Sequence, residues 1–249
     1  MSIITHKGGL LLGRQSDAIV TSDLVGNWDP STGVQTNYWD NQVGGGNNLR
    51  RFNGISKTNS LSAHFWVFDG TDDYLGEASS GYGGSAFTLN VDTAFTLAQW
   101  VKWDSTKEHA AFSVFGDSIN KFALLIGVTS ANKASLFLYG KGSATVFDYT
   151  FADDTWHYIT AVHKGSLLFE FYINGSFIGT VNHGGGEMTE YGAGNLRIGR
   201  NGSTYTDSTI KVGKVHVYTA ALNASQIRQN FLASHDVNNV RVYGATYTQ

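Results

Sequence analysis

Three aspartates in one short polar turn, Asp69, Asp72 and Asp73, carry the clearest chemical signal in this chain. They stand in the segment FDGTDDY, which gathers several carboxylate oxygens in one place. Such hard oxygen ligands suit Ca²⁺, so the turn is a candidate calcium site. The alternative is a structural turn, in which Asp69-Gly70 reverses the chain and the acids cap it.

Aromatic side chains in polar, glycine-rich loops form a second candidate site. Glycan binding needs exposed aromatic rings together with polar acceptors. The residues that fit this description are Tyr38, Trp39, Tyr82, Tyr191 and Tyr205. The alternative is that these rings anchor loops onto the domain or pack against another subunit. Tryptophans in predicted strands are expected in the core instead, namely Trp66, Trp100, Trp103 and Trp156.

Catalytic arrangements are missing from the sequence. Glu187 and Glu190 form the closest glutamate pair, but they stand in a loop-like segment, and Glu170 is alone in a predicted strand. No serine lies in a G-x-S-x-G elbow, and the histidines lack the spacing of a zinc site. His157 is expected to have a structural role. We therefore predict no catalytic residues and a protein that is not an enzyme.

Composition narrows the classes of partner. The 249 residues carry a net charge of −3 and show no cluster of Lys and Arg, which argues against nucleic-acid binding. Arg50-Arg51 is an isolated pair that we interpret as solvated surface. No apolar run approaches the ~18 residues of a membrane span, and no signal-peptide pattern opens the chain. The absence of cysteine fits assembly in a reducing cytoplasm.

Alternating apolar residues predict an all-β fold. WHYITAV and LLFEFYI each show a period of two, which indicates strands with one buried face. Asn174-Gly175 predicts a type I′ hairpin turn. Residues 94–104 are apolar on both faces and predict a central strand. We also expect one strand over residues 18–28 and a last strand within residues 237–247.

Two local patterns near the C-terminus are specific. In IKVGKVHVY a phase slip at Gly213 predicts a β-bulge. The bulge would turn four apolar residues to one side: Ile210, Val212, Val215 and Val217. A helix is predicted from Ala224 to about Ser234, with Asn223 and Gln226 as a capping box.

The chain shows no repeat and no linker. Residues 1–17 are predicted to be an arm, because Ile3, Ile4 and Leu10 to Leu12 could add an edge strand or dock on a partner. Residues 18–249 are predicted to form a single domain.

Several motifs occur in the order found in a known family. VFDGTDDYL, FTLAQWVKW, WHYITAV, FYING, LRIGR and KVHVYTAALNASQI resemble the blocks of laminin-G-like, concanavalin-A-like domains. LVGNWDPSTGVQTNYWDNQVGGGNN resembles the opening of such domains in bacteriophage structural proteins. The resemblance covers roughly residues 20–235. It implies a jelly-roll sandwich of two antiparallel sheets with one short C-terminal helix, and it implies that a structural calcium is often held by loop carboxylates.

The resemblance leaves the function open, because this fold hosts lectins, glycosidases, adhesion modules and capsid parts. Glycosidases of this fold carry Glu-x-Asp-x-(x)-Glu on one strand, and that pattern is missing here. The leading hypothesis is a non-enzymatic bacteriophage virion protein, a capsid decoration or fibre component made in the host cytoplasm. It would contact other virion proteins or copies of itself as a homo-oligomer. The alternative is a carbohydrate-binding module for host attachment, and a glycoside hydrolase ranks third.

Overall fold

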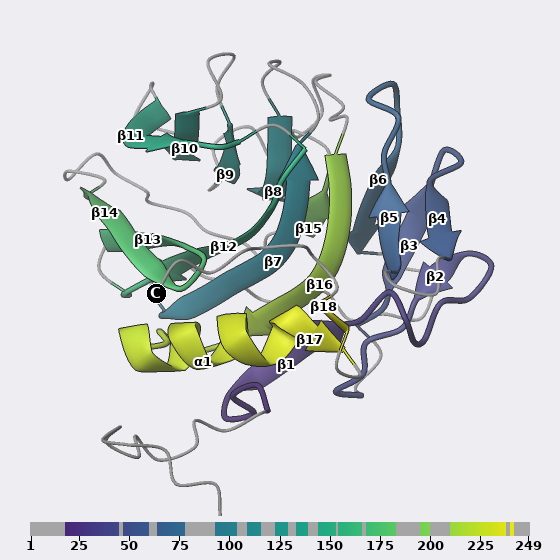
Figure 1. Ribbon diagram of the computed structural model, residues 1–249, viewed down its shortest axis with the longest axis horizontal. Helices are drawn as coiled ribbons and strands as arrows, with labels where there is room; N and C mark the ends of the chain where they lie inside the picture. The colour runs from purple at the N-terminus through teal and green to yellow at the C-terminus, as the bar shows by residue number, and fades with distance from the viewer. Residues whose placement is uncertain are drawn as a thin grey trace, which may run out of the picture.

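The structure is a computed structural model that describes residues 18–44, 47–59, 64–77, 93–103, 109–115, 123–128, 133–138, 144–152, 154–165, 168–182, 195–199, 210–237 and 240–241. Within these residues, strands form two large antiparallel sheets that face each other, and α1 (Ala224–His235) crosses the outside of one of them (Figure 1). The predicted jelly-roll sandwich of two antiparallel sheets with one short C-terminal helix is confirmed. Among the described residues, no helix has the length and apolarity to span a membrane.

The first sheet is built around the two longest strands, β7 (Phe95–Trp103) and β16 (Ile210–Tyr218). Its order is β14 (Ser176–Asn182), β13 (Leu168–Ile173), β12 (Trp156–His163), β7, β16, β5 (His64–Val67) and β4 (Ser56–Asn59). A further strand, β1 (Leu24–Trp28), also pairs with β16.

The second sheet has one edge strand from the middle of the sequence and one from near the N-terminus. Its order is β11 (Ala144–Thr150), β10 (Lys133–Leu138), β9 (Ala123–Val128), β8 (His109–Phe115), β15 (Asn195–Ile198), β6 (Tyr74–Glu77), β3 (Leu49–Phe52) and β2 (Tyr38–Trp39). The short strands β17 (Asp236–Val237) and β18 (Val240–Arg241) pair only with each other.

The core lies between the two sheets and is rich in large aromatic rings. Trp28, Trp39, Trp66 and Trp103 are all buried there. The other face of the first sheet is covered by α1, whose Ile227 and Phe231 pack on buried residues of β12 and β7. Burial of apolar surface on both sides of one sheet stabilises this three-layer arrangement.

Local signals in the sequence place several elements correctly. The register between β16 and β7 shifts between Val212 and Val215, so the bulge around Gly213 is confirmed. All four apolar residues of β16 named above lie in the core between the sheets. Asn174 and Gly175 have φ of 51° and 76°, as the hairpin between β13 and β14 requires. The Asn223–Gln226 capping box also forms, with bonds of 3.0 and 2.9 Å.

Two strand predictions are wrong in part. The strand expected over residues 18–28 begins only at Leu24, because Asp23 has φ of 58° and cannot continue an extended strand. The single buried face expected for β12 is also wrong. Every residue of β12 is buried, since α1 covers the face that the sequence pattern leaves for solvent. The predicted arm, residues 1–17, and most of the predicted last strand lie outside the described residues.

Candidate functional site

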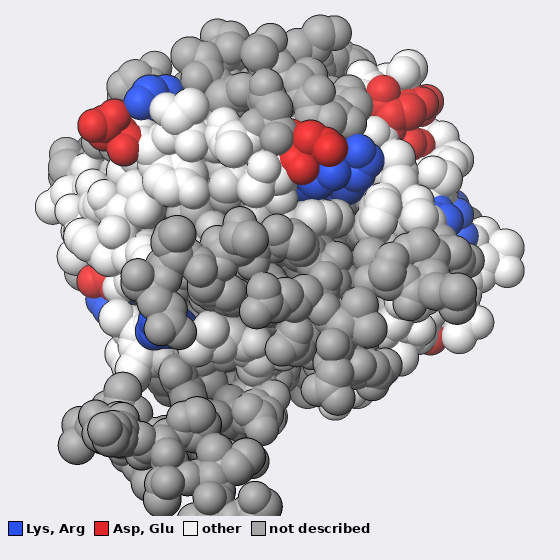
Figure 2. All heavy atoms as spheres, viewed as in Figure 1, with Lys and Arg blue, Asp and Glu red and all other residues white. Residues whose placement is uncertain are grey.

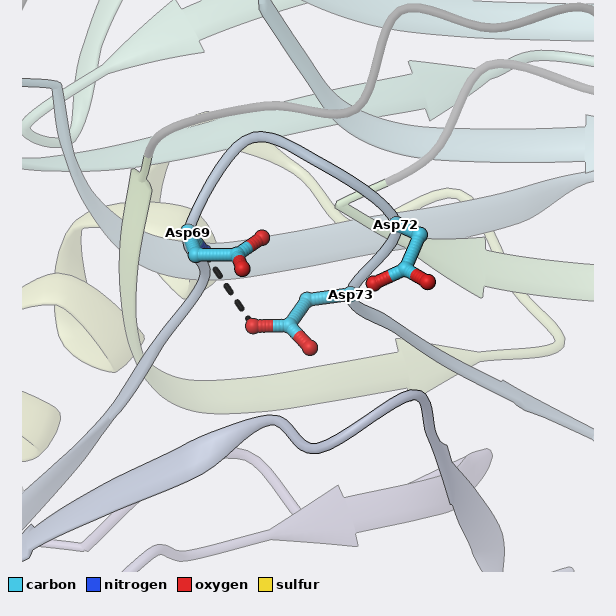
Figure 3. A group of neighbouring side chains, drawn as sticks. All are labelled: Asp69, Asp72 and Asp73. Carbon is cyan, nitrogen blue, oxygen red and sulfur yellow. Dashed lines mark hydrogen bonds between the residues drawn. The ribbon is translucent and has the colours of Figure 1, made fainter.

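The acidic turn joins β5 to β6 and is held by its own side chains. Asp69 Oδ1 accepts a hydrogen bond from the Thr71 amide at 2.7 Å. Asp73 Oδ2 accepts one from the Asp69 amide at 3.1 Å (Figure 3). Gly70 has φ of 75°, which lets the chain reverse. These contacts match the structural reading of the turn.

The same turn also has the geometry of a cation site. One carboxylate oxygen from each of Asp69, Asp72 and Asp73 lies within 4.8 Å of the others. Ca²⁺ takes oxygen ligands at about 2.3–2.6 Å, so ligands on opposite sides of one ion are roughly 5 Å apart. The residues present therefore fit calcium, which stays a prediction. Melting curves recorded with calcium and with a chelator distinguish a calcium site from a purely structural turn, because a bound ion raises the melting temperature.

The acidic turn borders a group of half-buried side chains on the second sheet. The side-chain Nδ2 of Asn53 donates a hydrogen bond to the backbone carbonyl of Asp72 at 2.8 Å, which connects the turn to the end of β3. Directly beside it, the rings of Phe52 and Tyr74 stack at 4.2 Å with an interplanar angle of 4°. We name the surface formed by Arg50, Phe52, Tyr74, Gly76 and Arg197 the arginine–aromatic face.

Strand alternation places this face on the outside of the sandwich. Leu49 of β3, Leu75 of β6 and Leu196 of β15 are fully buried in the core between the sheets. Successive side chains of a strand point to opposite faces. The residues next to these leucines therefore point outward: Arg50, Gly76 and Arg197.

The members of the arginine–aromatic face lie against one another. The guanidinium carbon of Arg50 is 4.9 Å from the centre of the Phe52 ring. A Cβ placed on Gly76 would lie 3.4 Å from Tyr74 Cε2 and 3.7 Å from Arg197 Cγ, so both side chains reach over this glycine. The arginine–aromatic face therefore has one arginine on β3 and one on β15, and the Phe52 and Tyr74 rings lie beside them.

Arg51 differs from its neighbour Arg50. Its guanidinium lies 5.0 Å from the centre of the Trp66 ring and donates to the carbonyls of Thr36 and Ile55, at 2.8 and 2.6 Å. The interpretation of Arg50-Arg51 as a solvated pair is therefore wrong for Arg51, which joins three segments of chain. Its neighbour takes the opposite direction because the two are consecutive in a strand.

The predicted glycan-binding aromatics have different outcomes. Tyr38 of β2 pairs with Arg50 of β3 and is partly exposed, so it extends the arginine–aromatic face toward the edge of the second sheet. Trp39 is fully buried, packs edge-on against Trp66 and donates from Nε1 to the Asp29 carbonyl at 3.0 Å. A platform role is wrong for Trp39, which anchors the loop as the alternative held. Tyr82, Tyr191 and Tyr205 lie outside the described residues.

The acids and histidines of the first sheet are engaged in structural contacts. Glu170 accepts a hydrogen bond from Tyr172 at 2.9 Å and pairs with Lys164 at 3.2 Å. Burial, together with Glu170, raises the pKa of Tyr172 to about 12. Burial lowers the pKa of His157 to about 4 and that of His216 to about 3. His216 is buried, and its Nδ1 atom lies 3.0 Å from the Tyr158 hydroxyl.

Phe52, Tyr74 and Arg197 were absent from the residues expected to bind ligands. Each stands in a short strand whose other face carries an apolar residue, so one alternating pattern hides both a core residue and a surface residue. The sequence signal that could have found part of this site is the alternation in LRRF, which places Arg50 and Phe52 on the same face of the strand. Pairing of β3 with β6, which brings Tyr74 beside them, depends on the register and is not a local feature.

Comparisons with known proteins agree with this geometry. Residues 53–228 match the family model described as the concanavalin A-like lectin/glucanases superfamily. The chain is 38% identical over 104 residues to adhesion G-protein coupled receptor V1 of Danio rerio, an alignment that covers 40% of this chain and 2% of the receptor.

Solved structures with the same fold include an enzyme and a toxin part. A Trypanosoma rangeli sialidase with 2,3-difluorosialic acid matches with a TM-score of 0.64 at 18% identity, over 87% of this chain and 33% of the sialidase. The binding domain of botulinum neurotoxin serotype D matches with a TM-score of 0.60 at 10% identity, over 84% of this chain and 51% of that chain. This chain thus spans about a third of the sialidase. From the matched residues and the two-sheet sandwich together, the chain belongs to the concanavalin A-like lectin/glucanase superfamily.

Proposed function

We propose that this protein is a non-enzymatic carbohydrate-binding module, whose site is the arginine–aromatic face with the adjoining acidic turn. The observation that carries the proposal is the contact between these two parts. The stacked Phe52 and Tyr74 rings offer apolar surface, and the exposed Asp69 and Asp72 offer acceptors for sugar hydroxyls. An apolar surface with a few fixed polar groups is the general chemistry of a small-ligand site.

The family and its structural neighbours support the same reading. The superfamily is named for lectins as well as glucanases. The neighbours include a sialidase in complex with sialic acid and the binding domain of a neurotoxin. Because this chain covers about a third of the sialidase, the activity of that enzyme is not carried over.

A non-enzymatic role is supported by where the acids lie. Retaining and inverting glycosidases need two carboxyl groups that flank the scissile bond at roughly 5–10 Å. Within the described strands, Glu170 is held by Tyr172 and Lys164, and Asp148 is held by Lys133 at 2.9 Å. Neither lies on the arginine–aromatic face, and in the adjoining acidic turn Asp69 and Asp73 accept hydrogen bonds from backbone amides of the turn itself.

The proposed setting is the surface of a bacteriophage virion, as a decoration or fibre component made in the host cytoplasm. The support is the sequence resemblance of residues 24–48 and a surface with few charges. Figure 2 shows that the charged side chains of the described residues on this face lie in small separate groups. Binding of a host glycan would give such a component a role in attachment. Electron microscopy of the source particle with an antibody to this chain tests the setting; labelling confined to unassembled protein would contradict it.

Contact with further copies of the chain is part of the proposal. The edge strands β11 and β14 of the two sheets lie on the same side of the sandwich (Figure 1). Phe147 of β11 lies against Gly179 of β14. On the same strands, Val146 is 52% exposed and Phe177 is 55% exposed. Exposed apolar side chains on edge strands favour pairing with another chain.

A glycan array with the purified protein tests the proposed function. We expect reproducible binding to a subset of saccharides, with at least a roughly tenfold loss in the Tyr74→Ala variant. Phe177→Ala is the matched control, because Phe177 is an exposed aromatic residue on the other sheet. A wild-type protein that binds no saccharide, or a Tyr74→Ala variant that stays folded and binds equally well, would contradict the proposal.

A further inference from the structure

We infer that Asn53 is a site of spontaneous deamidation, at which the folded chain slowly modifies itself beside the acidic turn. The inference comes from a comparison of two Asn-Gly pairs in the structure, Asn53-Gly54 and Asn174-Gly175. It goes beyond the proposed function, because the modification is a change in the protein itself and takes place with no saccharide present.

The reaction needs only an asparagine side chain, the backbone nitrogen of the next residue, and water. The Gly54 nitrogen gives up its proton to solvent and attacks Cγ of Asn53, which forms a C–N bond. The Cγ–Nδ2 bond breaks, the departing nitrogen takes up a proton and leaves as ammonia, and a cyclic succinimide remains. Water then opens the ring at either carbonyl and leaves aspartate or isoaspartate. Glycine favours this attack because no Cβ shields its nitrogen.

The first Asn-Gly pair lies open to solvent. Asn53 and Gly54 are both exposed, and a Cβ placed on Gly54 would have no neighbour within 4 Å. Within the part of the chain that the structure describes, one hydrogen bond holds the Asn53 side chain, from Nδ2 to the Asp72 carbonyl. A bond of this kind contributes only about 0.5–1.5 kcal/mol, so the side chain leaves it readily. The pair is therefore free to reach the geometry of attack.

The second pair is held by its neighbours. Backbone conformation does not separate the two pairs, since φ is 59° at Asn53 and 51° at Asn174. Asn174 Oδ1 accepts from the amide of the buried Tyr158, and the Asn174 amide donates to the Tyr158 carbonyl, both at 2.8 Å. A Cβ on Gly175 would lie 3.2 Å from the Arg228 Cα atom on α1. Attack at Asn174 therefore requires these bonds to break and the contact with α1 to open.

Deamidation of Asn53 changes the acidic turn in two ways. The bond to the Asp72 carbonyl is lost, because a carboxylate has no hydrogen to donate. A negative charge also appears beside the turn, where carboxylate oxygens of Asp69, Asp72 and Asp73 already lie within 4.8 Å of one another (Figure 3). Like charges at short range repel. The modification therefore loosens the connection between the turn and the end of β3.

Peptide mapping by mass spectrometry tests the inference on the full chain during incubation at pH 8. Conversion at each asparagine is read from the mass change when an amide becomes an acid. In the folded protein we expect Asn53 to react roughly tenfold or more faster than Asn174, which corresponds to a difference of about 1.4 kcal/mol in the barrier. In urea the two sites should react at similar rates, because the fold no longer protects Asn174.

Two variants separate the reaction from its consequence. Asn53→Gln is the matched control and should show no conversion at this position, since the longer side chain closes a ring slowly, while conversion at Asn174 is unchanged. Asn53→Asp carries one product from the start. It should melt at a lower temperature than the fresh wild type, and the aged wild type should shift toward it. An Asn53→Asp variant as stable as the wild type would contradict the loosening of the turn.

Two results would overturn the inference. One is an equal rate at Asn53 and Asn174 in the folded protein. The other is an Asn53 that stays an amide in the folded protein while the chain in urea is converted. Neither depends on a ligand. A protein that converts Asn53 and binds no saccharide contradicts only the proposed function, and one that binds saccharides with Asn53 unchanged contradicts only this inference.

Discussion

Two buried histidines on the first sheet make stability depend on pH at the scale of single residues. Burial lowers the pKa of His216 to about 3 and that of His157 to about 4. An unfolded chain takes up protons at these positions near pH 6.5, whereas the folded chain stays neutral. Folding stability is therefore complete above pH 6.5 and is lost as the pH falls from 6.5 toward 4.

The His216→Gln variant should flatten this acid slope. Each histidine that stays neutral in the folded state costs about 1.4 kcal/mol per pH unit below its unfolded pKa, and glutamine does not titrate. Glutamine also offers the Tyr158 hydroxyl a hydrogen-bond partner. Urea unfolding at pH 7.5, 5.5 and 4.5 measures the slope. An unchanged slope in a folded variant would show that His216 is not the group responsible.

Asp29 makes the stability of the fold depend on pH in a more acidic range than the histidines do. Burial acts to raise its pKa, but the charge of Lys214, 3.1 Å away, and hydrogen bonds from Ser31 outweigh burial, so the pKa is lowered. A carboxyl group with a lowered pKa stabilises the fold above its unfolded pKa of about 3.9, and the effect is lost as pH falls through the folded pKa.

Asp29→Asn should therefore destabilise the protein by about 1–3 kcal/mol at pH 7 and by less in strong acid. Asp148→Asn is the matched control, because its ion pair with Lys133 is on the surface and such pairs contribute little. Thermal unfolding of both variants at pH 7 makes the comparison. Equal midpoints for the two variants would contradict this role of Asp29.

At the scale of elements, α1 is fastened to the start of the domain by a closed set of hydrogen bonds. Asn230 Oδ1 accepts from the Val20 amide at 2.8 Å, and Asn230 Nδ2 donates to the Tyr218 hydroxyl at 2.9 Å. That hydroxyl in turn donates to the Val20 carbonyl at 3.1 Å. The Asn230 and Tyr218 side chains together thus satisfy the amide and the carbonyl of Val20, which lies outside the strands.

Asn230→Leu should cost about 2–4 kcal/mol, because it leaves buried polar groups of Val20 and Tyr218 without these bonds. Gln226→Ala, which removes only the exposed half of the helix cap, should cost about 1 kcal/mol or less. Chemical denaturation of both variants measures the difference. If Asn230→Leu costs no more than Gln226→Ala, the bonds do not fasten the helix as described.

The hairpin between β13 and β14 is fitted to the same helix. Gly175 has φ of 76°, and a Cβ there would lie 3.2 Å from the Arg228 Cα atom on α1. Gly54 also has a positive φ, of 97°, but a Cβ there would have no neighbour within 4 Å. Gly175→Ala should therefore lower the free energy of unfolding by about 1–3 kcal/mol more than Gly54→Ala does. Thermal unfolding of both variants measures this as a lower melting temperature for Gly175→Ala. Similar losses for both would mean that α1 yields at the contact.

Elements with a local cause could be predicted from the sequence, and those set by distant packing could not. The helix cap at Asn223, the bulge at Gly213 and the hairpin at Asn174 each depend on neighbouring residues. The second buried face of β12 depends on α1, which comes much later in the chain. For the candidate site, the acidic turn was visible as a motif, whereas Tyr74 and Arg197 join Arg50 only through strand pairing.

At the scale of the whole molecule, the two outer faces of the sandwich differ in what covers them. The first sheet is covered by α1 (Figure 1), and its edge strand β14 carries the exposed Phe177. The second sheet carries the arginine–aromatic face. In the proposed function, one side of the sandwich binds a ligand and the edges contact other copies of the chain.

Phe177→Lys should weaken self-association, because a charge on an edge strand opposes pairing with another chain. Val43→Lys is the control, since Val43 is an exposed apolar residue outside the strands. Sedimentation velocity of the wild type and both variants over a range of concentrations gives the distribution of species. A wild-type protein that remains monomeric throughout would contradict the proposed contact.

Saccharide binding on the outer face of the second sheet can be located by mapping amide chemical-shift changes in the labelled protein during titration with the saccharide that binds best. We expect the largest changes on residues 49–53 and 72–76 and on Arg197, with α1 unaffected. Changes centred on α1 and the first sheet, with β3 and β6 silent, would contradict it.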